Sequence, residues 1–286
     1  MGWWFELPVL WAASVACVFG LLIGSFLNVV VFRLPVAMHA YWEAQAKRSE
    51  DDLSPPPHWI RGLCSPASSC PKCRHRIRWY ENIPVLSWIM LRARCSACKT
   101  PISLRYPLVE LSAGVLVFLA TLRFGPSGAA VAASGLLLTL LVLALIDADT
   151  FELPDVLTLP LMWLGLLLNT SGMFVPLHDA VIGAAVGYLS LWAMYWLYLL
   201  IRGHEGMGYG DFKLMAALGA WMGWQMLPAI VLLSSLVGAM VGIFMILTER
   251  LGWKKPLPFG PYLAGAGALA LFYGPQINAW YLGKFH

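Results

Sequence analysis

The segment from Leu7 to Phe32 is 26 residues long and carries no charged side chain. At about 1.5 Å of rise per residue, a helix of this length crosses the hydrocarbon core of a bilayer, which is about 30 Å thick. Only Glu6 is charged ahead of it, so the segment lacks the basic start of a signal peptide. We therefore expect a retained transmembrane helix here.

Six further apolar runs follow the first. They cover residues 106–122, 124–146, 156–177, 180–201, 214–248 and 256–283. The run at 214–248 is too long for one crossing, and Pro228 with the Trp221–Gln225 segment lets it turn back as two helices. Hydrophobic residues make up 59% of the chain and charged residues only 12%, which excludes a soluble globule. The fold class expected is an all-α polytopic membrane protein with about eight transmembrane helices.

The basic residues are distributed unevenly over the connections. When eight spans are threaded through a membrane, the polar segments 33–105, 202–213 and 250–255 emerge on one side. They hold 17 of the 19 Lys and Arg residues, and such an excess marks the cytoplasmic side. The expected parts are a first helix (1–32), a cytoplasmic domain (33–105) and a membrane core (106–286).

The segment 33–105 is the only part with the character of a soluble domain. It contains twelve Lys and Arg residues against five acidic residues. This excess predicts attraction to anionic lipid headgroups, and positive-inside topology alone is an equally good explanation. We expect membrane lipids, and no nucleic acid, as its partners.

Four cysteines in this segment have the spacing of a metal site. Cys70-Pro-Lys-Cys73 is followed, after 21 residues, by Cys95-Ser-Ala-Cys98. Each C-x-x-C turn directs two thiolates at one ion, and two such turns complete a tetrahedral zinc site that is closed and therefore structural. A redox pair and plain buried thiols are the alternatives. Cys17 and Cys64 lack partners at a suitable spacing and are interpreted as ordinary apolar residues.

Two aspartates stand out because carboxylates next to apolar runs are costly unless they face protein or water. Asp211 ends the glycine-rich stretch Gly206-Met-Gly-Tyr-Gly-Asp211, and Asp147 follows the run that ends at Ile146. Asp211 is also placed to cap the next helix, but a cap does not explain three glycines. Glycine permits positive φ and lets another backbone approach closely.

The other acids near Asp147 have simpler interpretations. Asp155 follows Pro154 and is placed to cap the next helix, while Asp149 and Glu152 look like solvated loop charges. Two aspartates held close together at a partly desolvated interface share one proton, so that one acts as base and the other as acid. Such a pair can hydrolyse a peptide bond. Carboxylates in polytopic proteins also line proton and cation pathways, so spacing alone leaves both functions open.

Several motifs, in order over nearly the whole chain, carry a family resemblance. They are Gly24-Ser-Phe-Leu-Asn28 with Arg33-Leu-Pro35, the two C-x-x-C pairs, Asp147 seven residues ahead of the Pro in Leu153-Pro-Asp155, and Gly206–Lys213. Together they resemble the bacterial type IV prepilin peptidase family. The resemblance implies a multi-pass enzyme of the bacterial inner membrane whose active site faces the cytoplasm.

The resemblance also implies two activities. One removes the basic leader from type IV prepilins or type II secretion pseudopilins, and the other methylates the new N-terminal amine with S-adenosylmethionine as donor. Asp147 and Asp211 match the catalytic aspartates of the family, with Asp149 as the fallback for the first. Cys70, Cys73, Cys95 and Cys98 match its zinc ligands. The region Gly24–Arg33 belongs to the part associated with methylation, and close helix packing explains Gly24 and Asn28 equally well.

Two other functions remain open from the sequence. A transporter with a proton relay through Asp147 and Asp211 needs further ionisable groups in the membrane, and only Glu110 lies within the expected spans. A non-catalytic assembly component with a zinc-stapled domain explains the cysteines and the hydropathy. It does not explain why Asp211 follows a glycine-rich stretch.

Overall fold

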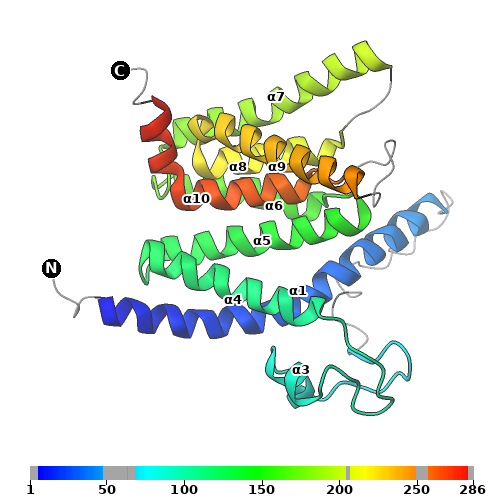
Figure 1. The fold of residues 1–286 in the computed structure, drawn as a ribbon. Helices are drawn as coiled ribbons and strands as arrows, with labels where there is room; N and C mark the ends of the chain where they lie inside the picture. The colour runs from blue at the N-terminus through cyan, green and yellow to red at the C-terminus, as the bar shows by residue number, and fades with distance from the viewer. Residues whose placement is uncertain (1–5, 48–62, 64–67, 204–206, 249–256, 283–286) are drawn as a thin grey trace. The chain divides into compact units, whose positions relative to one another are not determined.

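The computed structural model of the 286-residue chain describes residues 6–47, 63, 68–203, 207–248 and 257–282. These residues form helices, turns and two isolated β-bridges, with no strand among them. In chain order the helices are α1 (Glu6–Ala46), η1 (Trp79–Asn82), α3 (Leu86–Met90), α4 (Arg105–Phe124), α5 (Gly128–Thr150), α6 (Asp155–Asn169), α7 (Leu177–Arg202), α8 (Tyr209–Met222), η2 (Trp224–Met226), α9 (Leu227–Leu247) and α10 (Gly260–Leu282) (Figure 1). The all-α expectation is confirmed.

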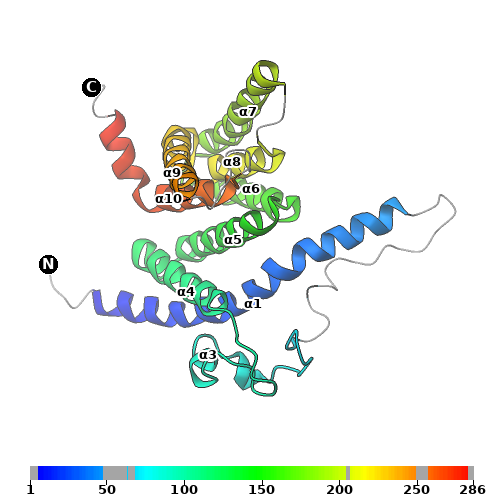
Figure 2. The same cartoon turned by 45° about the vertical axis from the view of Figure 1, so that its right-hand side comes forward.

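The chain divides into two compact units, residues 1–134 and 135–286. In the first unit α1 packs closely against α4 (Figures 1 and 2). A Cβ added at Gly24 would lie 2.8 Å from both Ala113 Cβ and Glu110 Cα. Asn28 Nδ2 donates a hydrogen bond to the Tyr106 carbonyl at 3.2 Å. Close helix packing therefore accounts for Gly24, as expected of a small residue where backbones meet.

Helix α1 extends beyond the expected end of the first span. It continues past Phe32 and through Pro35 to Ala46, which adds about four turns. The change from apolar to polar sequence at Arg33 therefore marks the end of the hydrophobic run and not the end of the helix. Four residues of the expected cytoplasmic segment that were considered above lie outside the described residues: Glu50, Asp51, Asp52 and Cys64.

The second unit is built around α8, which contacts α6, α7, α9 and α10 (Figures 1 and 2). From Asp211 to Met222 every residue of α8 is buried except Lys213. The crossing with α7 is made by Gly183 and Gly219, because a Cβ on either would collide with the carbonyl of the other. On the α6 side, Trp221 Nε1 donates to the Leu161 carbonyl at 2.8 Å. Small residues and one anchored indole thus fix the position of α8.

Five helices in the described part are long and apolar enough to cross a membrane. They are α1, α4, α5, α7 and the η2–α9 segment from Trp224 to Leu247. The predicted break in the long sixth run is confirmed, because α8 ends at Met222 and Gly223 turns the chain with φ of 79°. With 14 residues, α8 reaches about 21 Å, less than the thickness of a hydrocarbon core. It is covered by neighbouring helices instead of lipid.

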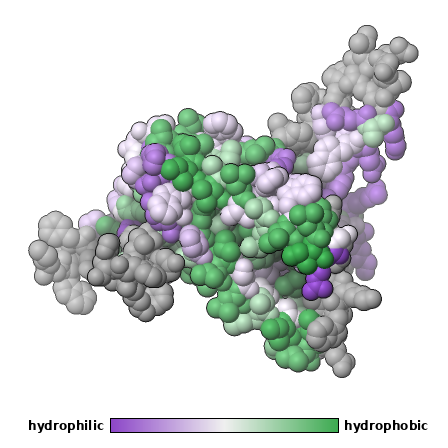
Figure 3. Space-filling view, turned by 90° about the horizontal axis from the view of Figure 1, so that it is seen from above, coloured by the Kyte–Doolittle hydropathy of each residue, from purple (hydrophilic) through white to green (hydrophobic). Residues whose placement is uncertain are grey.

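Many large apolar side chains are exposed on the surface of both units. Trp11, Phe32, Leu200 and Leu247 each expose more than 70% of their area. Figure 3 shows such hydrophobic residues over much of the face in view. Exposed apolar surface on this scale marks an interaction with another apolar phase. Together with the hydropathy of the helices, it identifies a multi-pass membrane protein.

Candidate active site

Asp147 lies in the last turn of α5, where its side chain is 5% exposed. Its Oδ2 accepts a hydrogen bond from the backbone N–H of Gly260, at the start of α10, with N and O 2.8 Å apart. Asp149, two residues later, is exposed at the end of the same helix. Of these two candidates from one motif, only Asp147 faces the interior of the second unit.

Asp211 lies in the first turn of α8 and is 6% exposed. It is close enough to Asp147 for the charge of that carboxylate to act on it. The alternative of a helix cap is excluded, because α8 has Gly208 at its N-cap and no side-chain cap bond. Oδ1 of Asp211 is buried and has no hydrogen-bond partner in the described part of the chain. The fold therefore brings the two aspartates together from separate helices.

The glycine-rich stretch acts through close approach and not through unusual φ angles. Gly206 lies outside the described residues, and Gly208 has φ of −80°. Gly210 is helical, and a Cβ added to it would lie 2.6 Å from the Cβ of Leu153. Of the two properties of glycine named above, positive φ is not used at Gly208 or Gly210, and close approach is used at Gly210. The contact with Leu153 brings the start of α8 against the connection between α5 and α6.

An ion pair joins the starts of α6 and α8. Lys213 Nζ lies 2.6 Å and 2.7 Å from the two carboxylate oxygens of Asp155. The expectation that Asp155 is an N-cap is wrong, since α6 begins at Asp155 itself and Pro154 occupies the cap position. Tyr209 and Phe212, from the same first turn of α8, pack on Tyr195 of α7. The first turn of α8, which carries Asp211, is therefore held by α6 through the ion pair and by α7 through the aromatic contacts.

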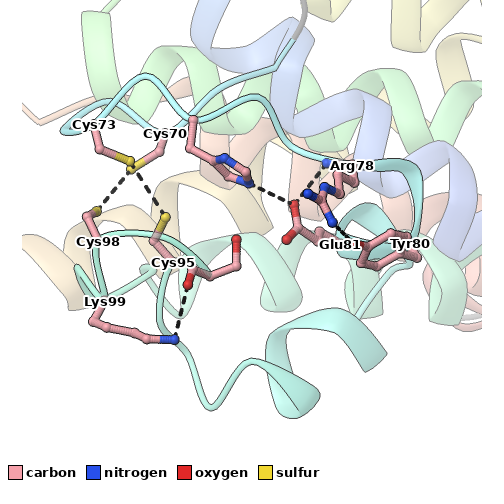
Figure 4. Close-up of polar contacts among 10 residues, drawn as sticks. Cys70, Cys73, Arg78, Tyr80, Glu81, Cys95, Cys98 and Lys99 are labelled. Atoms are coloured by element: carbon pink, nitrogen blue, oxygen red, sulfur yellow. Dashed lines mark hydrogen bonds and ion pairs between the residues drawn. The ribbon is translucent and has the colours of Figure 1, made fainter.

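The four cysteines meet in the first unit, as their spacing predicts (Figure 4). Their Sγ atoms all lie within 4.8 Å of one another. The Cys70–Cys98 and Cys73–Cys95 sulfur pairs are 3.7 and 3.9 Å apart. A tetrahedral ion with Zn–S bonds of about 2.3 Å requires sulfurs about 3.8 Å apart, so the donor set fits zinc.

The two C-x-x-C turns have the same backbone structure. In each, the first cysteine donates its N–H to the carbonyl five residues later, Cys70 to His75 and Cys95 to Thr100, both at 2.9 Å. The residue after the second cysteine, Arg74 or Lys99, has φ near 60°. An isolated antiparallel bridge flanks each turn, Ser69 with Arg76 and Arg94 with Pro101. Each C-x-x-C turn therefore forms one half of the four-cysteine cluster, and the two halves have the same backbone structure.

The thiols differ in their local electrostatics. Hydrogen bonds with the side chain and backbone of Thr100 lower the pKa of Cys98 to about 6. A backbone hydrogen bond from His75 acts to lower the pKa of Cys73, but desolvation and hydrogen bonds with the other thiols raise it to about 11. Binding of a metal ion by all four sulfurs therefore requires the release of protons from those cysteines that are still thiols, Cys73 among them.

Three contacts at these sites involve residues that sequence reasoning did not identify. Gly260 donates its backbone N–H to Asp147, Thr100 contacts Cys98, and the Val85 N–H donates to Glu110 Oε2 at 2.8 Å. Two of the three contacts are made by backbone N–H groups. Every residue except proline has such a group, so the residue type does not indicate the contact. The Gly-Pro pair at the start of the last apolar run indicates only a turn or a helix start.

Comparison with known proteins gives matches over nearly the whole chain. The model of the bacterial peptidase A24 N-terminal domain matches residues 18–124, and that of the type IV leader peptidase family matches residues 134–243. The chain is 51% identical over 276 residues to a prepilin leader peptidase/N-methyltransferase of Aeromonas hydrophila, covering 95% of this chain and 94% of the relative. Proteins of the same name from Stutzerimonas stutzeri and Pseudomonas aeruginosa are 53% identical over 267 residues (93% and 92%) and 51% identical over 272 residues (94% and 94%). No solved structure matches the chain.

Proposed function

Because the chain belongs to the type IV leader peptidase family, we propose that Asp147 and Asp211 are the catalytic pair of its peptidase activity. The protein is a bifunctional membrane enzyme that removes the leader of prepilins and methylates the N-terminal residue exposed by cleavage. The observation that supports the assignment of the pair is the burial of both carboxyl groups, from α5 and α8, in one unit and within electrostatic reach of each other. Asp149 is exposed and is not part of the pair.

The proposed pair hydrolyses the peptide bond by acid–base catalysis. One aspartate is ionised and takes a proton from water as the water oxygen bonds to the scissile carbonyl carbon. The other aspartate holds a proton and delivers it to the departing nitrogen as the carbon–nitrogen bond breaks. After one turnover the proton has moved between the two carboxyl groups, and exchange with water restores the starting state. No metal ion is required for these steps.

The cysteine cluster is proposed to hold one structural zinc ion through Cys70, Cys73, Cys95 and Cys98. Four thiolates fill a tetrahedral ion and leave no position for water or substrate, so zinc there stabilises the fold of residues 68–102. S-adenosylmethionine is proposed as methyl donor on the basis of the methyltransferase activity of the family. The substrate class is type IV prepilins, with type II secretion pseudopilins as the proposed extension.

The membrane setting follows from the distribution of charge. We place the protein in the bacterial inner membrane with residues 33–105 and both aspartates toward the cytoplasm, because residues 33–105 alone hold 12 of the 19 basic residues. The two candidate spans α4 and α5 follow this segment and return the chain to the same side at Asp147. A prepilin has a basic leader ahead of an apolar helix. The bond between them therefore lies where that helix meets the cytoplasmic interface.

The relay and assembly functions have less support. Glu110 is the one further acid within the expected spans, and its carboxylate accepts the Val85 N–H and a hydrogen bond from Ser25. These contacts lie within the first unit, and the aspartates lie in the second. Both contacts give Glu110 a local structural task within the first unit, and we therefore do not assign it to a relay.

A cleavage assay tests the proposed pair. Membranes containing wild type, Asp147→Asn or Asp211→Asn are incubated with a prepilin, with and without S-adenosylmethionine, and products are read by mass spectrometry. We expect cleavage by wild type alone, with a gain of one methyl group when the donor is present. Both variants should still methylate a precut substrate. Full cleavage by either variant would show that the catalytic role belongs to another residue.

A further inference from the structure

The carboxylate of Asp147 hydrogen-bonds to the backbone of Gly260 and leaves no space for a side chain at position 260. Oδ2 of Asp147 lies 2.8 Å from the Gly260 nitrogen. A Cβ built on Gly260 would lie 2.7 Å from Oδ2, 3.0 Å from Cγ and 3.2 Å from Cβ of Asp147. A side chain at position 260 would thus occupy the space that the carboxylate fills. Only glycine lets the backbone of α10 and this carboxylate meet.

The start of α10 favours an anion at Oδ2 for a second reason. The first N–H groups of a helix have no partner within the helix, and the helix dipole places partial positive charge there. Gly260 supplies one such N–H, and Pro261 has none to offer. The carbonyl of Phe259 accepts the N–H groups of Tyr262 and Leu263, at 3.1 Å each, which closes the first turn. The carboxylate of Asp147, from α5, therefore accepts an N–H group that has no partner within α10.

Helix dipoles do not separate the two carboxyl groups, because Asp211 lies in the first turn of α8 and Asp147 in the last turn of α5. Hydrogen-bond donors do separate them. The N–H of Asp211 donates to Gly208, but its side-chain Oδ1 is buried without a hydrogen-bond partner among the described residues. An ionised carboxylate buried without donors is costly, and a second anion nearby adds repulsion. The two buried carboxyl groups thus differ in one respect that bears on their roles. One receives a donor from a helix start, and the other does not.

We propose that Gly260 is a positioning residue that holds Asp147 as the ionised base of the pair, so that Asp211 carries the proton. The proposal rests on the proposed peptidase function and divides its two roles. Asp147 accepts the proton of the attacking water while Gly260 keeps the carboxylate oriented. Asp211 donates its proton to the departing nitrogen. Gly260 does not touch the reacting atoms and acts through Asp147.

The first experiment substitutes Gly260 and a matched glycine on the same helix. Gly260→Ala is compared with Gly265→Ala, since a Cβ at Gly265 meets nothing within 4 Å. A displacement of about 1 Å in a catalytic group costs about 100-fold in rate. We expect kcat for prepilin cleavage to fall about 100-fold in Gly260→Ala with KM unchanged. The added Cβ overpacks this contact, so the thermal midpoint should fall modestly in Gly260→Ala, while methylation of a precut substrate should stay at the wild-type level. Gly265→Ala should match wild type throughout.

The outcomes separate this proposal from the proposed function. Wild-type kcat in Gly260→Ala, with Asp147→Asn inactive, would overturn the positioning role and leave the catalytic pair intact. A rise in KM with kcat unchanged would also overturn it, because Gly260 would then act on substrate binding and not on the orientation of Asp147. If Asp147→Asn and Asp211→Asn both cleave normally, the proposed function itself fails.

A second measurement does not depend on the folding of Gly260→Ala. Infrared spectra of protein labelled with carbon-13 in the aspartate carboxyl groups report a protonated, weakly hydrogen-bonded carboxyl group as a separate band. We expect this band in wild type and Asp147→Asn, and its loss in Asp211→Asn. Any other pattern, including a band that survives in both variants, overturns the assignment of the proton to Asp211.

Discussion

Glu110 of α4 accepts a hydrogen bond from the backbone N–H of Val85, which precedes it by 25 residues and has φ of 61°. A β-branched residue with positive φ is an outlier that costs about 1–3 kcal/mol and persists only when its surroundings fix it. The carboxylate is 8% exposed and lies in the helix that packs on α1. It therefore fastens the segment after the first C-x-x-C turn to the α1–α4 pair.

Loss of this carboxylate should release the segment. In Glu110→Ala we expect the Val85 N–H to lose its partner, at a cost of about 1–3 kcal/mol, and amide exchange of the 83–91 peptide to accelerate. Glu110→Gln keeps an acceptor oxygen and should retain most of the protection. Hydrogen–deuterium exchange with mass spectrometry measures both. Equal protection in wild type and Glu110→Ala would contradict this account.

The cysteine cluster should bind zinc in a ratio of one ion to one chain. Cys98→Ser removes one of four ligands, so we expect zinc to be lost and residues 68–102 to become sensitive to protease. Cys17→Ser is the control, because Cys17 lies in α1 outside the cluster. Metal analysis of purified protein, before and after a chelator, is the measurement. Purified wild type without zinc would rule out the metal site.

The glycine crossing of α7 and α8 should be intolerant of added volume. Gly219→Ala places a methyl group against the carbonyl of Gly183, and overpacking of this kind costs about 1–3 kcal/mol. We expect a lower thermal midpoint in detergent and slower cleavage, because α8 carries Asp211. Gly135→Ala, where a Cβ meets nothing within 4 Å, should behave as wild type. A normal midpoint in Gly219→Ala would show that the helices separate without cost.

Asp149 should be dispensable for cleavage. It is exposed at the end of α5, and surface substitutions usually change the free energy of unfolding by less than about 0.5 kcal/mol. We expect Asp149→Asn to cleave prepilin within about twofold of the wild-type rate, measured in the same membrane assay. A loss comparable to that of Asp147→Asn would move the first catalytic role to Asp149.

The sequence predicts most of the architecture, because each apolar run corresponds to one helix, or to two in the long run 214–248. The break after Met222 was predictable from Gly223 and Pro228, which cannot continue a helix without cost. The end of α1 was not predictable in this way. The uncharged run stops at Arg33, whereas the helical backbone bonds continue through residues 33–46, where charged residues are interspersed among apolar ones.

At the sites, patterns of side-chain chemistry were informative and backbone contacts were not. The C-x-x-C spacing predicts the cluster of four sulfurs, since each turn fixes two thiols locally. The N–H of Gly260 reaches Asp147 across 113 residues, and no residue type signals such a contact. Asp155 was assigned a local cap because Lys213, its partner, is distant in sequence. Long-range pairing decided these roles, and the sequence alone does not show it.

The burial of α8 also has a biosynthetic consequence. A 14-residue helix that carries Asp211 and Lys213 is a poor substrate for release into lipid on its own. Its neighbours α6 and α7 are made before it, but α9 and α10 emerge from the ribosome afterwards. The nascent chain must therefore keep α8 with its earlier neighbours, or in the insertion machinery, until α10 arrives. Helix α10 completes the enclosure of α8, so this unit matures only after α10 has been made.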